Sequence, residues 1–242
     1  MTETITAAFA AAVRRDPAAP LLTFYDDASG DRTELSGATL DNWVSKTANL
    51  LVDGAGLGAG DTVAVLLPAH WQTAAVLLGT AAAGLAADLG PDPGAAEAMF
   101  TWPAQVERAR QWSAGDRYVT GLLPFAMPLR EIPPGFVDYP TEVRTHGDHF
   151  RPVQPVLPDD VAFAGPVELS HRQAMDAAGR RAASLGVAAG DRVLIDAHAY
   201  PDPADWLLMP LAAGASIVLC ANADPAALDK RVSAERVTVT LA

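Results

Sequence analysis

Residues 60–68 read GDTVAVLLP, and residues 190–198 read GDRVLIDAH. In each stretch a Gly-Asp turn opens a short apolar run of strand length, as in a strand buried on both faces. An apolar helix is expected after each run, over Trp71–Ala83 in the first, and a second apolar strand after that. Strand, helix and strand in this order predict a parallel sheet with a right-handed crossover.

The two stretches belong to a longer internal similarity. A shift of 130 residues aligns residues 60–89 with residues 190–219 at 11 identical positions, four of which are Ala. We therefore interpret the chain as a doubly wound α/β fold whose mostly parallel sheets are built from two similar βαβ halves. The alternative is a chance match between two βαβ units in an Ala-rich chain.

Other segments have clear local patterns. Leu21–Tyr25 and Arg32–Leu35 flank a turn-forming stretch, which predicts a β-hairpin. Apolar residues from Leu40 to Leu51 recur every three or four positions, which predicts a helix capped by Ser36 or Thr39. Asp224–Ser233 predicts a further helix.

The prolines between Leu122 and Pro158 exclude long regular elements and leave one short helix near Tyr139–Thr145. This pattern divides the chain into three parts. We expect a first α/β half at 1–121, a proline-rich surface connection at 122–158 and a second α/β half at 159–242.

Composition excludes several classes of protein. Half of the 242 residues are hydrophobic and 19% are charged, which excludes a disordered chain. Acidic residues outnumber basic ones, 29 to 17, which argues against a nucleic-acid or anionic-membrane partner. No apolar run is long enough to span a membrane, so we expect a cytoplasmic protein. The single Cys220 follows Ile217-Val218-Leu219, which predicts a buried, unreactive thiol.

Two motifs have functional and structural interpretations. Gly54–Ala59 fits G-x-G-x-x-A, but here the glycines leave a helix and open a strand, the reverse of a dinucleotide-binding fingerprint. We interpret them as a helix C-terminal turn. His146-Gly147-Asp148-His149 contains three potential zinc ligands, but a solvated polar loop is the favoured interpretation, and we predict no metal site.

His70 and His198 each follow a predicted buried strand, at the strand end where α/β sheets bind ligands. Neither has a nucleophile as an evident partner, so a helix-capping or loop role is favoured for both. Chemistry through these imidazoles, or through His146 and His149, remains a third hypothesis for the function.

Residues 159–171 read DDVAFAGPVELSH. Together with Leu22–Tyr25, Leu57–Pro68 and Ala83–Ala87, this segment resembles the AMP-forming adenylating enzymes: acyl-CoA synthetases, peptide-synthetase adenylation domains and luciferases. The resemblance covers nearly the whole chain and implies the fold of the N-terminal subdomains of these ligases. Within it, Asp160–Phe163 is similar to the strand that precedes the phosphate-binding loop, and Val167–His171 to the entry of the next helix.

The chain departs from the family at the phosphate-binding loop. Where the family has a longer loop with serines, threonines and a lysine, this chain has a degenerate position of Ala164, Gly165, Pro166 and Val167. A triphosphate requires backbone N–H groups, hydroxyls and a cation around it. The sequence also stops at Ala242, before the family's adenine- and ribose-binding segments and its catalytic lysine. Neither lysine of the chain, Lys46 or Lys230, matches a family site.

From this departure we expect no catalytic residue and no nucleotide cofactor, and we retain His171 and His198 as candidate pocket residues. The first hypothesis is a non-catalytic binding or assembly protein that forms a homodimer over an apolar face or the Val237–Leu241 edge. The alternative is the acyl- or adenylate-binding component of a ligase that a protein partner completes. That alternative requires ATP or AMP with Mg²⁺.

Overall fold

The computed structural model describes residues 3–92 and 94–242. Within them the backbone forms two compact units that interleave along the sequence. Unit 1 comprises the residues up to Leu40, Pro68–Ala74 and Arg172–Ala242, and unit 2 comprises Asp41–Leu67 and Ala75–His171. These units do not follow the linear division at 1–121, 122–158 and 159–242, because chain from both ends of the sequence contributes to unit 1.

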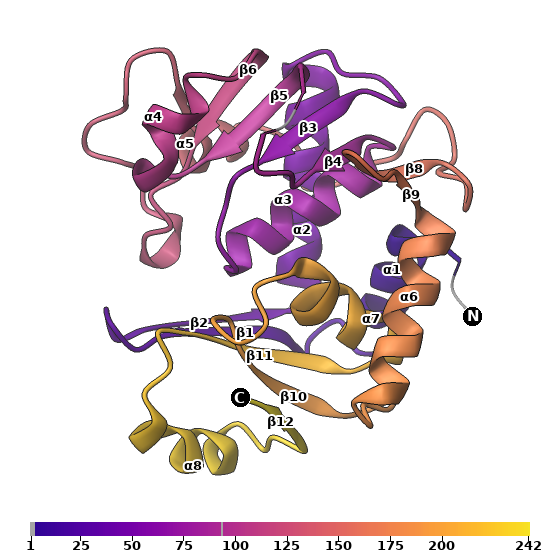
Figure 1. Ribbon diagram of the computed structural model, residues 1–242, viewed down its shortest axis with the longest axis vertical. Coiled ribbons are helices and arrows are strands. Elements are labelled where there is room, and N and C mark those ends of the chain that lie inside the picture. The colour runs from indigo at the N-terminus through magenta and orange to yellow at the C-terminus, as the bar shows by residue number, and fades with distance from the viewer. Residues whose placement is uncertain (1–2, 93) are drawn as a thin grey trace. The chain divides into compact units, whose positions relative to one another are not determined.

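Unit 1 contains a five-stranded sheet in the order β12-β10-β11-β1-β2 (Figure 1). The predicted hairpin is confirmed as the antiparallel pair β1–β2, and the other strands pair in parallel. Its strands are β1 (Pro20–Asp26), β2 (Asp31–Ser36), β10 (Arg192–Asp196), β11 (Ser216–Ala221) and β12 (Val239–Leu241). Its helices are α1 (Ile5–Arg15), α6 (His171–Ser184), α7 (Met209–Ala213) and α8 (Pro225–Ala234). The first residue of α6 is the last residue of unit 2. A π-helical turn (Ala204–Leu208) precedes α7.

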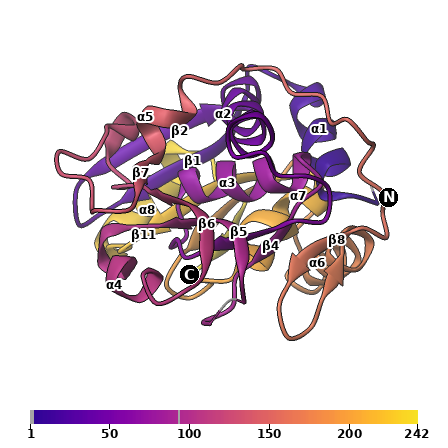
Figure 2. The same cartoon turned by 90° about the horizontal axis from the view of Figure 1, so that it is seen from above.

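Unit 2 contains a seven-stranded sheet in the order β7-β6-β5-β3-β4-β8-β9, in which only the terminal pair β8–β9 is antiparallel within the described residues (Figure 2). Its strands are β3 (Thr62–Val65), β4 (Ala86–Asp88), β5 (Ala96–Thr101), β6 (Ala114–Val119), β7 (Val137–Asp138), β8 (Val161–Ala164) and β9 (Leu169–Ser170). Its shorter helices are α4 (Val106–Ala109), α5 (Tyr139–Val143), a π-helical turn (Leu50–Gly54) and two 3₁₀ turns (Pro103–Gln105 and Pro124–Ala126).

Two helices pass from one unit into the other: α2 (Gly37–Asn49) and α3 (Trp71–Ala82). The cap predicted for the first of them is Ser36, whose Oγ accepts a hydrogen bond from the Thr39 amide at 3.1 Å. After the π-helical turn the glycine-rich stretch leads into β3, so it follows a helix and opens a strand, as interpreted from the sequence. A phosphate-binding fingerprint requires the opposite order.

The two βαβ copies, β3-α3-β4 and β10-α7-β11, share backbone details. Gly60 N–H donates to Gly84 O at 3.1 Å, and Gly190 N–H donates to Gly214 O at 3.1 Å. The φ angles agree as well, +91° and +89° at the first glycine of each pair, +74° and +76° at the second. In each Gly-Asp turn the aspartate carboxylate accepts an amide three residues earlier, at 2.8 and 2.7 Å. The two units therefore share the backbone geometry of both turns, which a common βαβ build also produces.

The proline-rich stretch 122–158 contains more structure than a surface connection. It supplies β7 to one edge of the unit 2 sheet and then helix α5, whose Tyr139 and Val143 are fully buried. Asp138 caps that helix by accepting the Thr141 amide at 3.0 Å, and the hydroxyls of Tyr139 and Thr47 lie 2.7 Å apart. Proline is tolerated here because Pro140 lies in the first helical turn, where its missing N–H is not needed.

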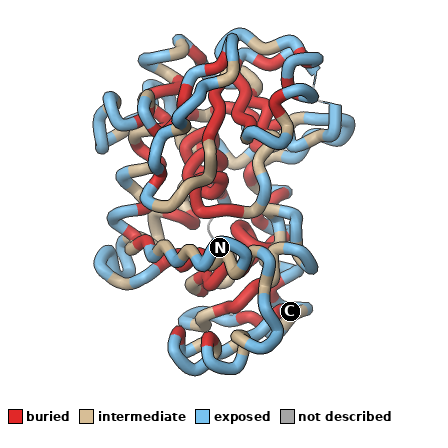
Figure 3. Tube along the Cα trace, turned by 90° about the vertical axis from the view of Figure 1, so that its left-hand side faces the viewer, coloured by how far each residue is buried: buried red, intermediate tan, exposed pale blue. Residues whose placement is uncertain are grey.

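Buried residues form most of the central strands β3, β4, β10 and β11. Figure 3 colours the buried stretches of the chain red. In unit 1, Leu194, Val218 and Cys220 form one apolar cluster. In unit 2, a larger cluster includes Met99, Trp112 and Phe136. None of the helices in residues 3–92 and 94–242 combines the length and apolarity needed to cross a membrane.

Candidate functional site

The degenerate loop position is a short turn between β8 and β9. The two strands pair antiparallel, Phe163 with Leu169, so only five residues separate the ends of this pairing. Gly165 has a φ of +139°, a conformation that favours glycine. The side chain of Val167 is 76% exposed. The turn therefore offers a ligand backbone groups and a methyl surface, with no hydroxyl and no ammonium.

His171 follows β9 and begins α6. Its backbone N–H donates to Asp160 O at 3.0 Å, and its side chain is fully buried. Burial lowers the imidazole pKa, against the opposing effect of the Asp160 carboxylate. Neither ring nitrogen has a hydrogen-bond partner among the described residues. This candidate is thus a neutral, enclosed imidazole with no base, acid or nucleophile bonded to it.

His198 lies in unit 1, in the exposed turn after β10. Its backbone N–H donates to the Asp196 carboxylate at 2.8 Å, so the aspartate shapes the turn and leaves the imidazole in solvent. The two candidate histidines belong to different units and share no partner in the described structure.

His70 has the capping role favoured from the sequence. It precedes α3, and its Nδ1 accepts the Gln72 amide at 3.1 Å. Its ring meets Phe24 edge-on, with 4.3 Å between centroids. Burial lowers the pKa of His70 to about 3, so the imidazole is neutral at physiological pH and Nδ1 stays an acceptor.

The loop 146–149 is anchored to α2. Lys46 Nζ donates to His146 O at 2.6 Å, and Asn49 Nδ2 donates to Gly147 O at 2.8 Å and His149 O at 3.0 Å. His149 itself is 95% exposed. In the part of the chain that the structure describes, no three His, Cys, Asp or Glu side chains gather in a way that could hold a metal ion. Lys46, one of the two lysines, is engaged in this contact.

Cys220 is a free, buried thiol in β11. Burial raises its pKa, although Arg231 beside it acts in the opposite direction. The sequence-based expectation of a buried small residue rather than a reactive thiolate is confirmed.

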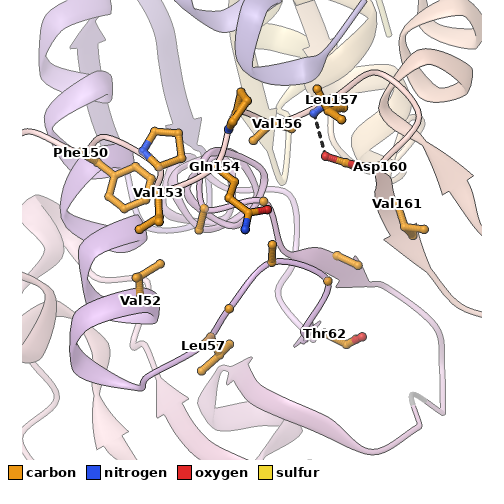
Figure 4. Close-up of a pocket in the computed structure, with 18 of the residues that line it drawn as sticks. Val52, Leu57, Thr62, Phe150, Val153, Gln154, Val156, Leu157, Asp160 and Val161 are labelled. Atoms are coloured by element: carbon orange, nitrogen blue, oxygen red, sulfur yellow. Dashed lines mark hydrogen bonds between the residues drawn. The ribbon is translucent and has the colours of Figure 1, made fainter.

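Unit 2 contains a cavity of about 810 Å³, within the usual range for small-molecule sites (Figure 4). Its walls come from four segments of the chain, within residues 49–53, 57–62, 83–86 and 150–168. Three of them include the loops before β3, β4 and β8, whereas α/β sheets usually bind ligands at the opposite, carboxyl ends of their strands. The cavity also reaches Ala164 and Glu168, which flank the degenerate turn.

Small residues form the floor of the cavity, and residues 150–157, here called the strap, cross it. Gly58, Gly60 and Gly84 lack side chains that could fill the space. The strap contributes Val153, Gln154 and Leu157, and Figure 4 shows Gln154 reaching toward the opening above Leu57. A hydrogen bond from the Leu157 amide to Asp160 Oδ2, 2.7 Å long, holds the end of the strap.

The cavity lining carries a net negative charge. It includes four carboxylates and one guanidinium, that of Arg151; the carboxylates belong to Asp53, Asp159, Asp160 and Glu168. Asp53 and Glu168 are exposed and form no hydrogen bond or ion pair with any other described residue. The sequence predicted the turn because its residues are contiguous. It missed the cavity because the walls are far apart along the chain.

Comparisons with known proteins identify the class to which this fold belongs. A family model described as AMP-binding enzyme matches residues 9–89. The structure is similar to the acyl-CoA synthetase of Brucella canis, with a TM-score of 0.73 and 20% identity over 96% of this chain and 46% of that one. It is also similar to the acetoacetyl-CoA synthetase of Streptomyces lividans, with a TM-score of 0.72 and 20% identity over 98% of this chain and 42% of that one. The chain therefore has the N-terminal fold of AMP-forming ligases and spans about half the length of these solved enzymes.

A closer relative gives the family. A Mycobacterium tuberculosis (strain ATCC 25618 / H37Rv) protein described as "TIGR03089 family protein" is 44% identical over 236 residues, which cover 95% of this chain and 94% of that protein. The chain belongs to the TIGR03089 family.

Proposed function

We propose that this protein is a non-catalytic relative of the adenylating enzymes, retained for binding or assembly. The observation that carries the proposal is the turn Ala164–Val167. Removing one preorganised donor from an oxyanion site typically costs about 10²–10³ in rate. Here the family's hydroxyl and ammonium donors are all absent from the turn.

Charge next to the turn supports the same proposal. Glu168 follows the turn directly, and Asp159 and Asp160 precede β8. Carboxylates near a polyphosphate weaken its binding, because like charges repel each other. No lysine lines the cavity, and its one guanidinium belongs to the exposed Arg151. We therefore expect neither ATP nor AMP with Mg²⁺ to bind the isolated protein tightly.

The cavity favours a second candidate function. Its volume suits an acyl group or an adenylate, and it reaches both flanks of the turn. In this alternative the chain supplies a pocket, and a partner protein supplies the missing phosphate contacts and the lysine. The isolated protein would then retain affinity for an adenylate that lacks the β- and γ-phosphates.

Two measurements test the proposal. Purified protein incubated with ATP, Mg²⁺ and a panel of carboxylic acids should release no pyrophosphate above a blank, with an active acyl-CoA synthetase as the positive control. Calorimetry with a non-hydrolysable acyl-adenylate mimic should show no saturable heat. Pyrophosphate release by the chain alone contradicts the proposal.

A matched variant separates the two candidates. If the mimic binds, Glu168→Gln should tighten it, because a carboxylate beside the phosphate position has been removed. Saturable binding with this response, without turnover, supports the partner-completed ligase. If neither the wild-type protein nor Glu168→Gln binds the mimic, the result supports the proposal of a non-catalytic protein.

A further inference from the structure

The segment between β6 and β7 places apolar side chains on the surface of unit 2. Phe125 is 80% exposed, and Met127 and Val137 are about half exposed. Apolar residues that are scattered singly over a surface are normal, whereas a group of them is typical of an interaction site.

Hydrogen bonds hold this segment against both ends of α5. The Leu129 amide donates to Asp138 Oδ1 at 3.0 Å, and Arg144 Nη2 donates to Phe125 O at 2.9 Å. Asp138 and Arg144 flank α5, which has five residues and is therefore only about 8 Å long. The two anchors lie on either side of Met127 and next to β7. The three exposed apolar side chains therefore belong to one surface, here called the Phe125 surface.

The backbone of this turn is strained. Phe125 has a φ of +55° and Ala126 a φ of +49°, in the left-handed region that a bulky side chain rarely adopts. Ala126 is fully buried and anchors the turn, whereas the phenyl ring of Phe125 gains little burial in return for its backbone conformation. Strain of this kind is typical of binding sites.

Two arginines place positive charge beside the apolar side chains. Arg130 is exposed within the segment, and Arg144 is bonded to it through Phe125 O. Neither guanidinium forms an ion pair with a carboxylate of the described residues. The whole chain has a formal net charge of −12, so unpaired guanidinium groups next to apolar surface are a local exception. Such groups attract carboxylates of a partner.

We propose that the Phe125 surface, with Arg130 and Arg144 beside it, docks an acidic amphipathic segment of another protein. The apolar side chains of that segment cover Phe125 and Met127, and its carboxylates pair with the two guanidinium groups. This proposal is independent of the turn at 164–167, because it holds whether or not the protein releases pyrophosphate.

The size of the surface favours a partner segment over a second copy of this chain. Three partly exposed side chains offer on the order of 300 Å² of apolar area, since a large side chain offers roughly 150–250 Å² when fully exposed. A stable interface between two folded proteins buries roughly 800 Å² on each partner. The apolar area alone is therefore too small for a stable homodimer.

The probe is a synthetic helical peptide with leucines on one face and glutamates on the other, and the control peptide has glutamine in place of each glutamate. Each carries a fluorescent label, and its anisotropy is followed as full-length protein is added at about 0.15 M salt, where screening limits the effect of distant carboxylates. We expect saturable binding of the acidic peptide and about tenfold weaker binding of the control, because two charge pairs are lost. Equal binding of both peptides, or no saturable binding of the acidic one, overturns the proposal.

Matched variants locate the docking surface. Phe125→Ser should weaken binding of the acidic peptide at least tenfold, whereas Val153→Ser, which removes a side chain that is 93% exposed elsewhere in unit 2, should not change it. Arg130→Gln should weaken binding by about fivefold, the effect of one unit charge at contact distance in water. Glu131→Gln removes the exposed carboxylate next to Arg130 and should tighten binding. Equal affinity in Phe125→Ser and Val153→Ser contradicts the proposal.

Light scattering distinguishes a partner segment from a second copy. Wild-type protein and Phe125→Ser should have the same mass, because the Phe125 surface is not expected to join two copies. If Phe125→Ser alone converts a dimer to a monomer, the surface binds a second copy and the proposal is wrong.

Discussion

Glu235 is the most strongly bonded carboxylate of unit 1. It follows α8 and accepts the Tyr25 hydroxyl at 2.6 Å, Arg192 Nη2 at 2.5 Å, and Arg32 at 2.8 and 3.1 Å. Burial alone would raise its pKa, but the hydrogen bonds from these three residues outweigh burial and lower the pKa to about 2. One carboxylate thereby joins the end of α8 to β1, β2 and β10.

We expect Glu235→Gln to destabilise the protein by about 2–3 kcal/mol at pH 7, because two arginines lose their shared counter-charge. The folded pKa lies below the ordinary value of 4.5, so this stabilisation is complete above pH 4.5 and declines as the pH falls toward 2. Urea unfolding of both proteins at several pH values measures the difference. Glu34→Gln, which removes a half-exposed partner of Arg32, should have a smaller effect. A difference that stays constant down to pH 2.5 contradicts this assignment.

At the scale of elements, the two βαβ copies have the same backbone and different neighbours. Gly84 and Gly214 end equivalent helices with φ angles of +74° and +76°. Each needs the left-handed conformation, which costs other residues roughly 1–2 kcal/mol. Only Gly214 has a guanidinium against it, that of Arg15. The repeat therefore accounts for the backbone conformation of the two glycines, but not for the side chains that pack against them.

Alanine at each glycine tests this difference. We expect Gly84→Ala to cost about 1 kcal/mol of unfolding free energy from backbone strain alone. Gly214→Ala should cost about 0.5–1 kcal/mol more, because Arg15 must withdraw and lose its hydrogen bond. In an Arg15→Ala background the two substitutions should become equal, as a double-mutant cycle by urea unfolding would show. If the difference persists without Arg15, the packing explanation is wrong.

At the scale of the whole molecule, each unit has its own sheet, and each sheet ends in an edge strand. In unit 1, β12 is an edge strand that pairs with β10 on one side. Unpaired edges favour pairing with another chain. We therefore expect a homodimer that uses the β12 edge, the assembly anticipated from the sequence for Val237–Leu241.

Light scattering at micromolar concentration measures this assembly. Wild-type protein should have the mass of a dimer. Thr240→Lys, which places a charge on the exposed face of β12, should shift it to a monomer. Ala234→Lys, on the exposed surface of α8, is the control and should remain dimeric. A wild-type protein with the mass of a monomer would contradict the expected homodimer.

The sequence by itself predicted the hairpin, the parallel strand order within each βαβ unit and the degenerate turn. It also predicted the buried Cys220, and it favoured a capping or loop role for His70. These follow from periodicity, turn residues and capping, which act over a few neighbouring positions. The proline-rich stretch was underestimated, because a pattern of breakers does not reveal which residues between them become buried.

Only the tertiary structure decided how the segments combine. The cavity needs four segments up to a hundred residues apart, and the bonding of Glu235 needs side chains from three strands. The pairing of Arg15 with Gly214 likewise joins opposite ends of the chain. Such contacts depend on how buried surfaces fit together, and many different distant pairings are compatible with the same local pattern.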